Sequence, residues 1–295
     1  MLALKPAGEP LPALTTELLT SVYQHRLLTC SQVHAMHLPA HTRRWAQQIL
    51  TELTRRGLVE FVRAGRGAPR LYYLTQAGAE AVELVPTRVE TRRKLFTAEQ
   101  AAGPLWRHTL AVNETGIAFM RAAQQRGDEF GALAWRHEIA HPITPPTYNP
   151  AELLISDALL TYLEHGPDGQ LTFHYRLLEL DRATVPADTL ASKLARYARL
   201  YRHTRRGETH TPAWQERYPI FPDIICVLAD KPRPTLERRT QIVLALCRED
   251  PQLKRTPQVR VSLALLEDLQ AHGPHAPIWR RPSNPAQTLD WQGRP

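Results

Sequence analysis

The chain has 295 residues, of which 43% are hydrophobic, and its 37 lysines and arginines outnumber 29 acidic residues, giving a formal net charge of +8. This length suits two domains, and three widely separated cysteines argue against a disulfide framework or a cysteine-based zinc module. No apolar run reaches the roughly 18 residues of a membrane-spanning helix, and the first residues lack the apolar segment of a signal peptide. We therefore expect a cytoplasmic protein with no membrane partner, whose positive charge favours a polyanion.

Residues 15–84 have the pattern of a winged helix-turn-helix domain. Three short amphipathic helices are expected first, and the third opens at His41 and is ended by Gly57. Two strands should follow, at residues 58–63 and 70–74, on either side of a glycine-rich basic turn. The order of these elements resembles that of many winged-helix DNA-binding domains.

Five arginines are the candidate DNA-binding residues of this domain. In a winged helix the third helix enters the major groove, and the wing formed by the two strands lies beside the phosphate backbone. The arginines on these two elements are Arg43, Arg44, Arg63, Arg66 and Arg70. They predict double-stranded DNA as the partner, although winged helices also serve as protein-interaction or dimerisation modules. Replication or DNA-processing proteins and a homodimer are therefore further candidate partners.

The remainder of the chain predicts a linker, a second domain and a tail. Residues 85–104 are rich in charge and are interpreted as the linker, and residues 105–272 as an α/β domain. Within that domain, residues 235–248 form an amphipathic pattern with Arg239 on its outward face. Residues 273–295 are rich in proline, which favours an irregular tail.

The sequence His137-Glu138-Ile-Ala-His141 matches the HExxH motif of zinc proteases. That chemistry requires a helix, because two histidines one helical turn apart must share the ion. Here apolar residues alternate as in a strand, and Pro142 would stop a helix at once. In a strand the two histidines would lie about 13 Å apart, so a zinc protease is only a remote alternative.

Two apolar runs, residues 153–163 and 171–180, flank a turn of His-Gly-Pro-Asp-Gly and predict a buried β-hairpin. The runs carry three acidic residues, Asp157, Glu179 and Asp181. Two hairpin registers are possible, and they place Asp157 opposite either Leu178 or Glu179. A carboxylate in an apolar strand carries a desolvation cost of several kcal/mol unless it is paired, so these side chains need a partner or a metal ion.

The hairpin and the helix after it resemble a known family. Three motifs are similar to those of the replication-relaxation family: Ser156-Asp157, the string Glu-Leu-Asp-Arg-Ala-Thr from Glu179, and the Lys193-x-x-x-Tyr197 spacing. The resemblance implies a winged helix followed by a nuclease-like domain of the PD-(D/E)xK type, and thus an α+β fold. It also implies a degenerate site, because Asp181 stands where active nucleases carry lysine.

Two functions follow from this resemblance. The first is a DNA-binding protein of plasmid or mobile-element replication or DNA processing, with a degenerate nuclease-like domain. The alternative is an active Mg²⁺-dependent DNA nuclease or nickase, in which Asp157, Glu179 and Asp181 hold the metal ion and Lys193 supplies the missing ammonium group. These four residues are therefore the candidate catalytic residues. Whether they hold a metal ion distinguishes the nuclease from the DNA-binding protein.

Overall fold

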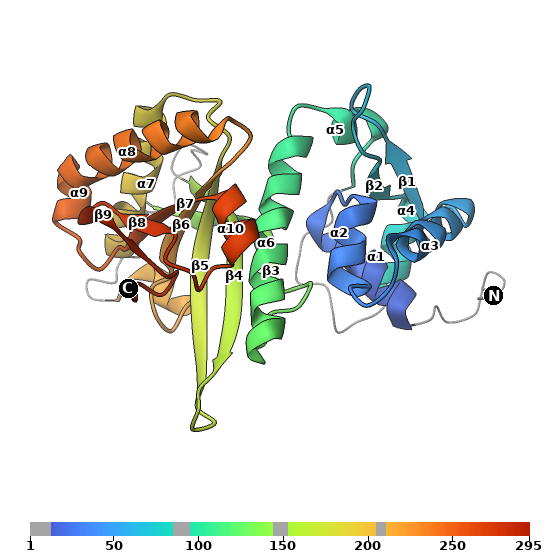
Figure 1. Cartoon of the computed structure of the whole chain (residues 1–295), viewed down its shortest axis with the longest axis horizontal. Helices are drawn as coiled ribbons and strands as arrows, with labels where there is room; N and C mark the ends of the chain where they lie inside the picture. The colour runs from blue at the N-terminus through green and yellow to red at the C-terminus, as the bar shows by residue number, and fades with distance from the viewer. Residues whose placement is uncertain (1–12, 85–94, 144–152, 205–210) are drawn as a thin grey trace. The chain divides into compact units, whose positions relative to one another are not determined.

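A computed structural model of the chain describes residues 13–84, 95–143, 153–204 and 211–295 (Figure 1). The chain divides into two compact units, residues 1–110 and 111–295. The described residues form an α+β structure with a two-stranded and a seven-stranded sheet. None of their helices combines the length and the low polarity needed to cross a lipid bilayer.

The first unit consists of short helices around a small antiparallel sheet. Local sequence explains the helix starts, since the side chains of Thr29 and Thr75 each accept a hydrogen bond from a backbone N–H of the first helical turn. Leu28 adds a single bridge to Tyr72 beside the sheet. The elements are α1 (Ala13–His25), α2 (Cys30–His37), α3 (Arg43–Arg55), β1 (Val59–Val62), β2 (Leu71–Leu74) and α4 (Gln76–Glu83).

Part of the expected linker is a helix. Residues 85–94 lie outside the described residues, but α5 (Ala98–Ala102) begins with a capping box between Thr97 and Gln100. Ala101 is fully buried in a cluster with residues of the small sheet. Residues 98–102 therefore belong to the first unit, which corrects their assignment to a linker.

The second unit is organised around the seven-stranded sheet. Its strand order is β3-β4-β5-β6-β7-β8-β9, in which β6 is parallel to both of its neighbours and the other pairs are antiparallel. The elements are α6 (Trp106–Arg126, of which residues 106–110 fall in the first unit), β3 (Trp135–Pro142), β4 (Leu153–His165), β5 (Leu171–Asp181), α7 (Ala187–Arg202), a 3-10 turn (Ala213–Glu216), β6 (Asp223–Leu228), α8 (Arg233–Glu249), α9 (Pro251–Lys254), β7 (Val261–Leu265), α10 (Leu266–His272), β8 (Trp279–Arg281) and β9 (Asn284–Leu289).

Helices pack on both faces of this sheet. Tyr197 of α7 and Leu244 of α8 share a buried cluster with Leu177 of β5. The side chain of Trp135 on β3 lies against α6, and a Cβ at Gly116 would fall 2.4 Å from its ring, so glycine is needed for this close approach. Burial on both faces explains why β6 is apolar from Ile224 to Leu228.

The proline-rich end of the chain is not irregular. Residues 279–281 and 284–289 form β8 and β9, which extend the sheet past β7. Trp279 and Trp291 are almost fully buried. The prediction of a tail over residues 273–295 is therefore wrong, because the two tryptophans outweigh the local effect of the prolines.

Candidate functional site

The β4–β5 hairpin adopts the register that brings two carboxylates together. Ala158 pairs with Leu178 and His165 with Leu171. Continued by one residue, this register sets Asp157 opposite Glu179, which is the second of the two registers that the sequence allowed. An Oδ atom of Asp157 accepts a hydrogen bond from the backbone N–H of Leu180 at 2.7 Å. The carboxylate of Asp157 is thus fixed at the strand that carries Glu179.

Glu179 is enclosed by two residues of α7. Its side chain is buried, and one carboxylate oxygen accepts a hydrogen bond from the Tyr197 hydroxyl at 2.5 Å. The other oxygen accepts a hydrogen bond from the Lys193 ammonium group. The Nζ atom of Lys193 lies 3.8 Å from Asp157, so one ammonium group serves two carboxylates. Lys193 and Tyr197 share a helix face because they are four residues apart.

The charges in this cluster shift one another's pKa values. Burial, reinforced by the negative charge of Asp157, raises the pKa of Glu179 to about 8 despite the opposing charge of Lys193. Burial by itself would lower the pKa of Lys193, but Glu179 and Asp157 outweigh it and the pKa is raised. Burial and the charge of Glu179 also place the pKa of Tyr197 well above its ordinary value. Lys193 is therefore the cation of the cluster and Tyr197 a neutral donor.

Asp181 belongs to a separate ion pair. It is buried, and Arg239 of α8 contacts its two carboxylate oxygens at 2.5 and 3.1 Å. The backbone N–H of Ala183 donates to the same carboxylate at 3.1 Å. Arg239 was expected on the outward face of its helix, and this interpretation is wrong because the Asp181 carboxylate draws its guanidinium inward. The charge of Asp181 is thus balanced by the guanidinium group of Arg239.

The three carboxylates do not form a metal site in this arrangement. Among the described residues, no group of three His, Cys, Asp or Glu side chains is placed to hold a metal ion. Glu179 and Asp181 direct their oxygens at cationic or hydroxyl donors of the protein itself. A Mg²⁺ ion would have to replace these donors, since it requires several oxygen ligands at about 2.0–2.1 Å.

The HExxH residues lie on β3, as their alternation predicted. The Nε2 atom of His137 lies 3.0 Å from the side-chain oxygen of Asn113, whereas Nε2 of His141 is paired with the Tyr218 hydroxyl at 2.8 Å. The two histidines thus serve different buried contacts. This strand geometry removes the zinc-protease alternative.

The arginines proposed to bind DNA lie at the start of α3 and in the turn between β1 and β2. Arg43, Arg44, Arg63 and Arg66 are exposed, and Arg70 lies over the ring of Phe61 at 4.4 Å. Within the described part of the chain, none of the five forms an ion pair with a carboxylate. Their positive charges are therefore not neutralised by any carboxylate that the structure describes.

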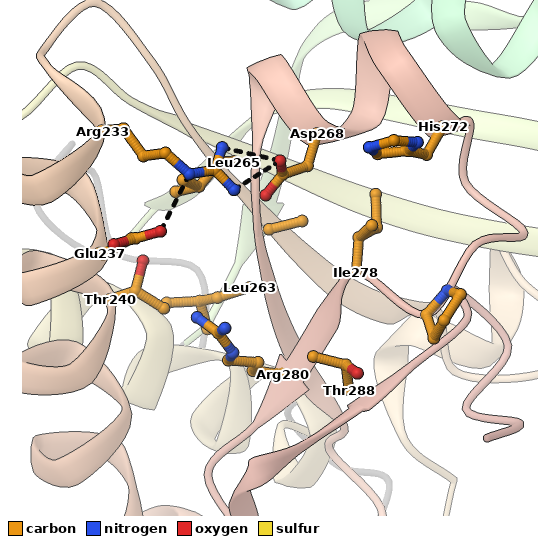
Figure 2. A pocket seen from close by; sticks show the side chains of 12 residues that line it. Arg233, Glu237, Thr240, Leu263, Leu265, Asp268, His272, Ile278, Arg280 and Thr288 are labelled. Carbon is orange, nitrogen blue, oxygen red and sulfur yellow. Dashed lines mark hydrogen bonds and ion pairs between the residues drawn. The ribbon is translucent and has the colours of Figure 1, made fainter.

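A pocket of about 210 Å³ opens between α8, β7, α10 and the β8–β9 hairpin (Figure 2). Figure 2 shows Arg233 held between Asp268 and Glu237, at 2.8 and 3.0 Å. The Arg233 guanidinium group at this end of the pocket is thus already paired with carboxylates of the protein. None of the candidate catalytic residues lines it.

One comparison with known proteins identifies the family. The family model for replication-relaxation matches residues 19–213. This match spans more than half of the chain, so the protein belongs to the replication-relaxation family, which confirms the resemblance read from its motifs. No curated protein and no solved structure matches the chain. Family membership indicates a role in replication or DNA processing.

The titration of Glu179 makes a prediction for stability. Its pKa is about 8 in the folded state against an ordinary value of 4.5, so between these values the folded protein holds a proton that the unfolded chain has lost. The contribution of Glu179 to the free energy of unfolding should therefore fall as pH rises, by about 1 kcal/mol per pH unit. The other titratable groups that face this carboxyl are Asp157, Lys193, Tyr197 and the thiol of Cys226.

Urea unfolding between pH 6.5 and 8 is the measurement. Burial lowers the pKa values of His37, His141 and His275 from 6.5 to about 4, so near pH 6.5 the unfolded chain binds protons at these imidazoles that the folded protein does not. This contribution rises with pH and is the same in the wild type and in Glu179→Gln, so the difference between their slopes isolates the falling contribution of Glu179. Equal slopes for the wild type and the variant would show that Glu179 is ionised throughout.

Proposed function

We propose that this protein binds double-stranded DNA through its first unit and acts in replication or DNA processing, with the second unit as a nuclease-like scaffold. The observation that carries the proposal is the set of arginines at the start of α3 and in the β1–β2 turn, which form no ion pair with a described carboxylate. In a winged helix these two elements meet the major groove and the phosphate backbone. The element order α1-α2-α3-β1-β2-α4, with Leu28 bridging to Tyr72, supports that fold assignment.

Replacing Arg43 and Arg44 together by alanine should weaken binding to duplex DNA by more than tenfold. The reason is the loss of two cationic contacts to phosphates or base edges, which should also lessen the dependence of affinity on salt concentration. Fluorescence anisotropy with labelled duplex DNA at several salt concentrations would measure both effects.

A matched control removes two exposed arginines of the second unit, Arg238 and Arg248. This control variant loses the same two positive charges as the α3 variant. Comparing the two therefore separates a local contact of α3 with DNA from the general attraction between a positive protein and DNA. If both double variants lose the same affinity, or neither loses any, α3 is not the DNA-reading helix.

The nuclease-like assignment of the second unit rests on element order and on the facing carboxylates. The succession α6, β3, β4, β5, α7 and β6 supports the PD-(D/E)xK assignment, with Asp157 on one strand and Glu179 on the next. We infer a scaffold and not an active nuclease because Lys193, Tyr197 and Arg239 already occupy the carboxylates of Glu179 and Asp181.

Incubation of supercoiled plasmid with the protein and Mg²⁺ or Mn²⁺ should leave the plasmid intact. The internal partners of the carboxylates explain this expectation, since an ion would have to displace them before it could activate water. Agarose gel electrophoresis would report any nicked or linear product. Cleavage that disappears with a chelator and in Glu179→Gln would instead establish the alternative, a metal-dependent nuclease.

A further inference from the structure

The β4–β5 hairpin extends beyond the strands that flank it (Figure 1). β6 pairs with β5 only from Arg176 onward, and the pairing of β3 with β4 extends only to Leu160. Beyond Leu160, Thr161 and Leu163 form backbone hydrogen bonds with Ala134 and Glu129. Residues 164–175 therefore project as a two-stranded extension with two faces. Side chains of β5 alternate between these faces along the strand.

One face of this extension is covered by the end of the chain. The side chain of Trp291 packs against Tyr162 and His174, with ring centroids 4.9 and 5.1 Å apart. Gln292 donates a hydrogen bond to Glu164 at 2.8 Å. Tyr162, Glu164 and His174 are thus engaged in internal contacts.

The opposite face carries exposed aromatic surface. Phe173 and Leu171 are each 54% exposed, although both are large apolar side chains in an ordered strand. The ring of Phe173 lies nearly parallel to that of Tyr175, at a centroid distance of 6.4 Å and an angle of 17°. Tyr175 in turn contacts Tyr218 edge to face at 5.9 Å. Three rings therefore form a row from the hairpin toward the body of the sheet.

Positive charge adjoins the inner end of this row. Burial raises the pKa of Tyr218 to about 12, and the charges of Arg217 and Arg136 oppose that shift, so both guanidinium groups act on its ring. Arg217 is exposed and donates a hydrogen bond to the backbone oxygen of Ala140 at 2.8 Å, and no carboxylate of the described residues forms an ion pair with it. The surface thus joins the exposed ring of Phe173 and the half-buried ring of Tyr175 to the cation of Arg217.

We propose that this face of the hairpin, formed by Phe173, Tyr175 and Arg217, binds single-stranded DNA. Unpaired bases stack on aromatic rings while cations contact the backbone, and this mode tolerates any sequence. A duplex hides the faces of its bases, so the aromatic row selects single strands. The inference rests on the DNA-related role proposed above and adds a second surface to it, suited to a protein that meets both duplex and opened DNA.

The test compares the affinities of an oligothymidylate of about 16 nucleotides and of duplex DNA, both measured by fluorescence anisotropy. Phe173→Ala should weaken oligothymidylate binding by between about fivefold and 150-fold, the range for loss of one stacked base, and leave duplex affinity unchanged. Phe173→Leu should behave like alanine because it lacks a ring, whereas Phe173→Trp should retain binding. Ile242→Ala, which trims another exposed apolar side chain, is the matched control.

The outcomes separate this proposal from the duplex-binding function. If Arg43→Ala with Arg44→Ala abolishes duplex binding while Phe173→Ala leaves oligothymidylate binding intact, the hairpin inference fails and the proposed function stands. Retained binding in Phe173→Leu would also overturn it, since stacking would then be unnecessary. Sedimentation showing a dimer that Phe173→Ala converts to monomer would assign the face to a second copy of the chain. Thermal unfolding of each variant should match the wild type, because Phe173 is half exposed.

Discussion

Replacing Lys193 by alanine should lower the free energy of unfolding by about 3 kcal/mol. Removing one member of a buried ion pair commonly costs 3–5 kcal/mol, because the remaining charge stays buried without compensation. The low end applies here for two reasons. The Lys193 side chain is 33% exposed, so water reaches part of the cluster, and Glu179 can take up a proton once its partner is gone. Urea denaturation at pH 8 would measure the loss.

The double variant Lys193→Ala with Glu179→Gln provides the control for this prediction. It removes the ammonium group and the charge that depends on it, so it should recover much of the stability lost in Lys193→Ala. The coupling free energy from the double-mutant cycle then isolates the interaction between the two side chains. A cost below about 0.5 kcal/mol for Lys193→Ala, the level of an ordinary surface substitution, would mean that water already screens the pair.

Local pattern predicted the hairpin and the partners of Glu179. The two apolar runs identified both strands. The turn between them, whose length was uncertain by one residue, limited the register to two choices. The four-residue spacing of Lys193 and Tyr197 placed both on one helix face, which the structure turns toward Glu179. These inferences succeeded because each depends on residues close together in sequence.

The partner of Asp181 could not be predicted in this way. Arg239 lies 58 residues further along the chain, on a helix whose position against β5 depends on the packing of the entire sheet. Helical periodicity distinguishes an apolar face from a polar one, but it does not reveal which polar residue at the boundary meets a buried carboxylate. The same limit applies to β8 and β9, whose prolines concealed two strands held by long-range contacts.

Trp291→Ala should lower the free energy of unfolding by about 3–5 kcal/mol, although position 291 lies outside the residues that match the family. The Trp291 side chain is 1% exposed, and its ring lies 5.2 Å from Phe119 of α6 and 4.9 Å from Tyr162 of β4. The guanidinium of Arg176 stacks over it at 4.6 Å. Alanine would leave a large cavity between a helix and the sheet and would uncover a buried cation.

Urea unfolding of Trp291→Ala and of Trp291→Phe would test this role of the chain end. Phenylalanine keeps an aromatic face for Arg176 and fills most of the space, so it should lose much less stability than alanine. Ile220→Ala, at a side chain that is 66% exposed, should change stability by less than about 0.5 kcal/mol. A loss below about 1 kcal/mol for Trp291→Ala would show that the segment contributes little to the sheet. The expected larger loss would instead make residues 273–295 part of the folding unit that presents the hairpin, because they cover the face opposite Phe173.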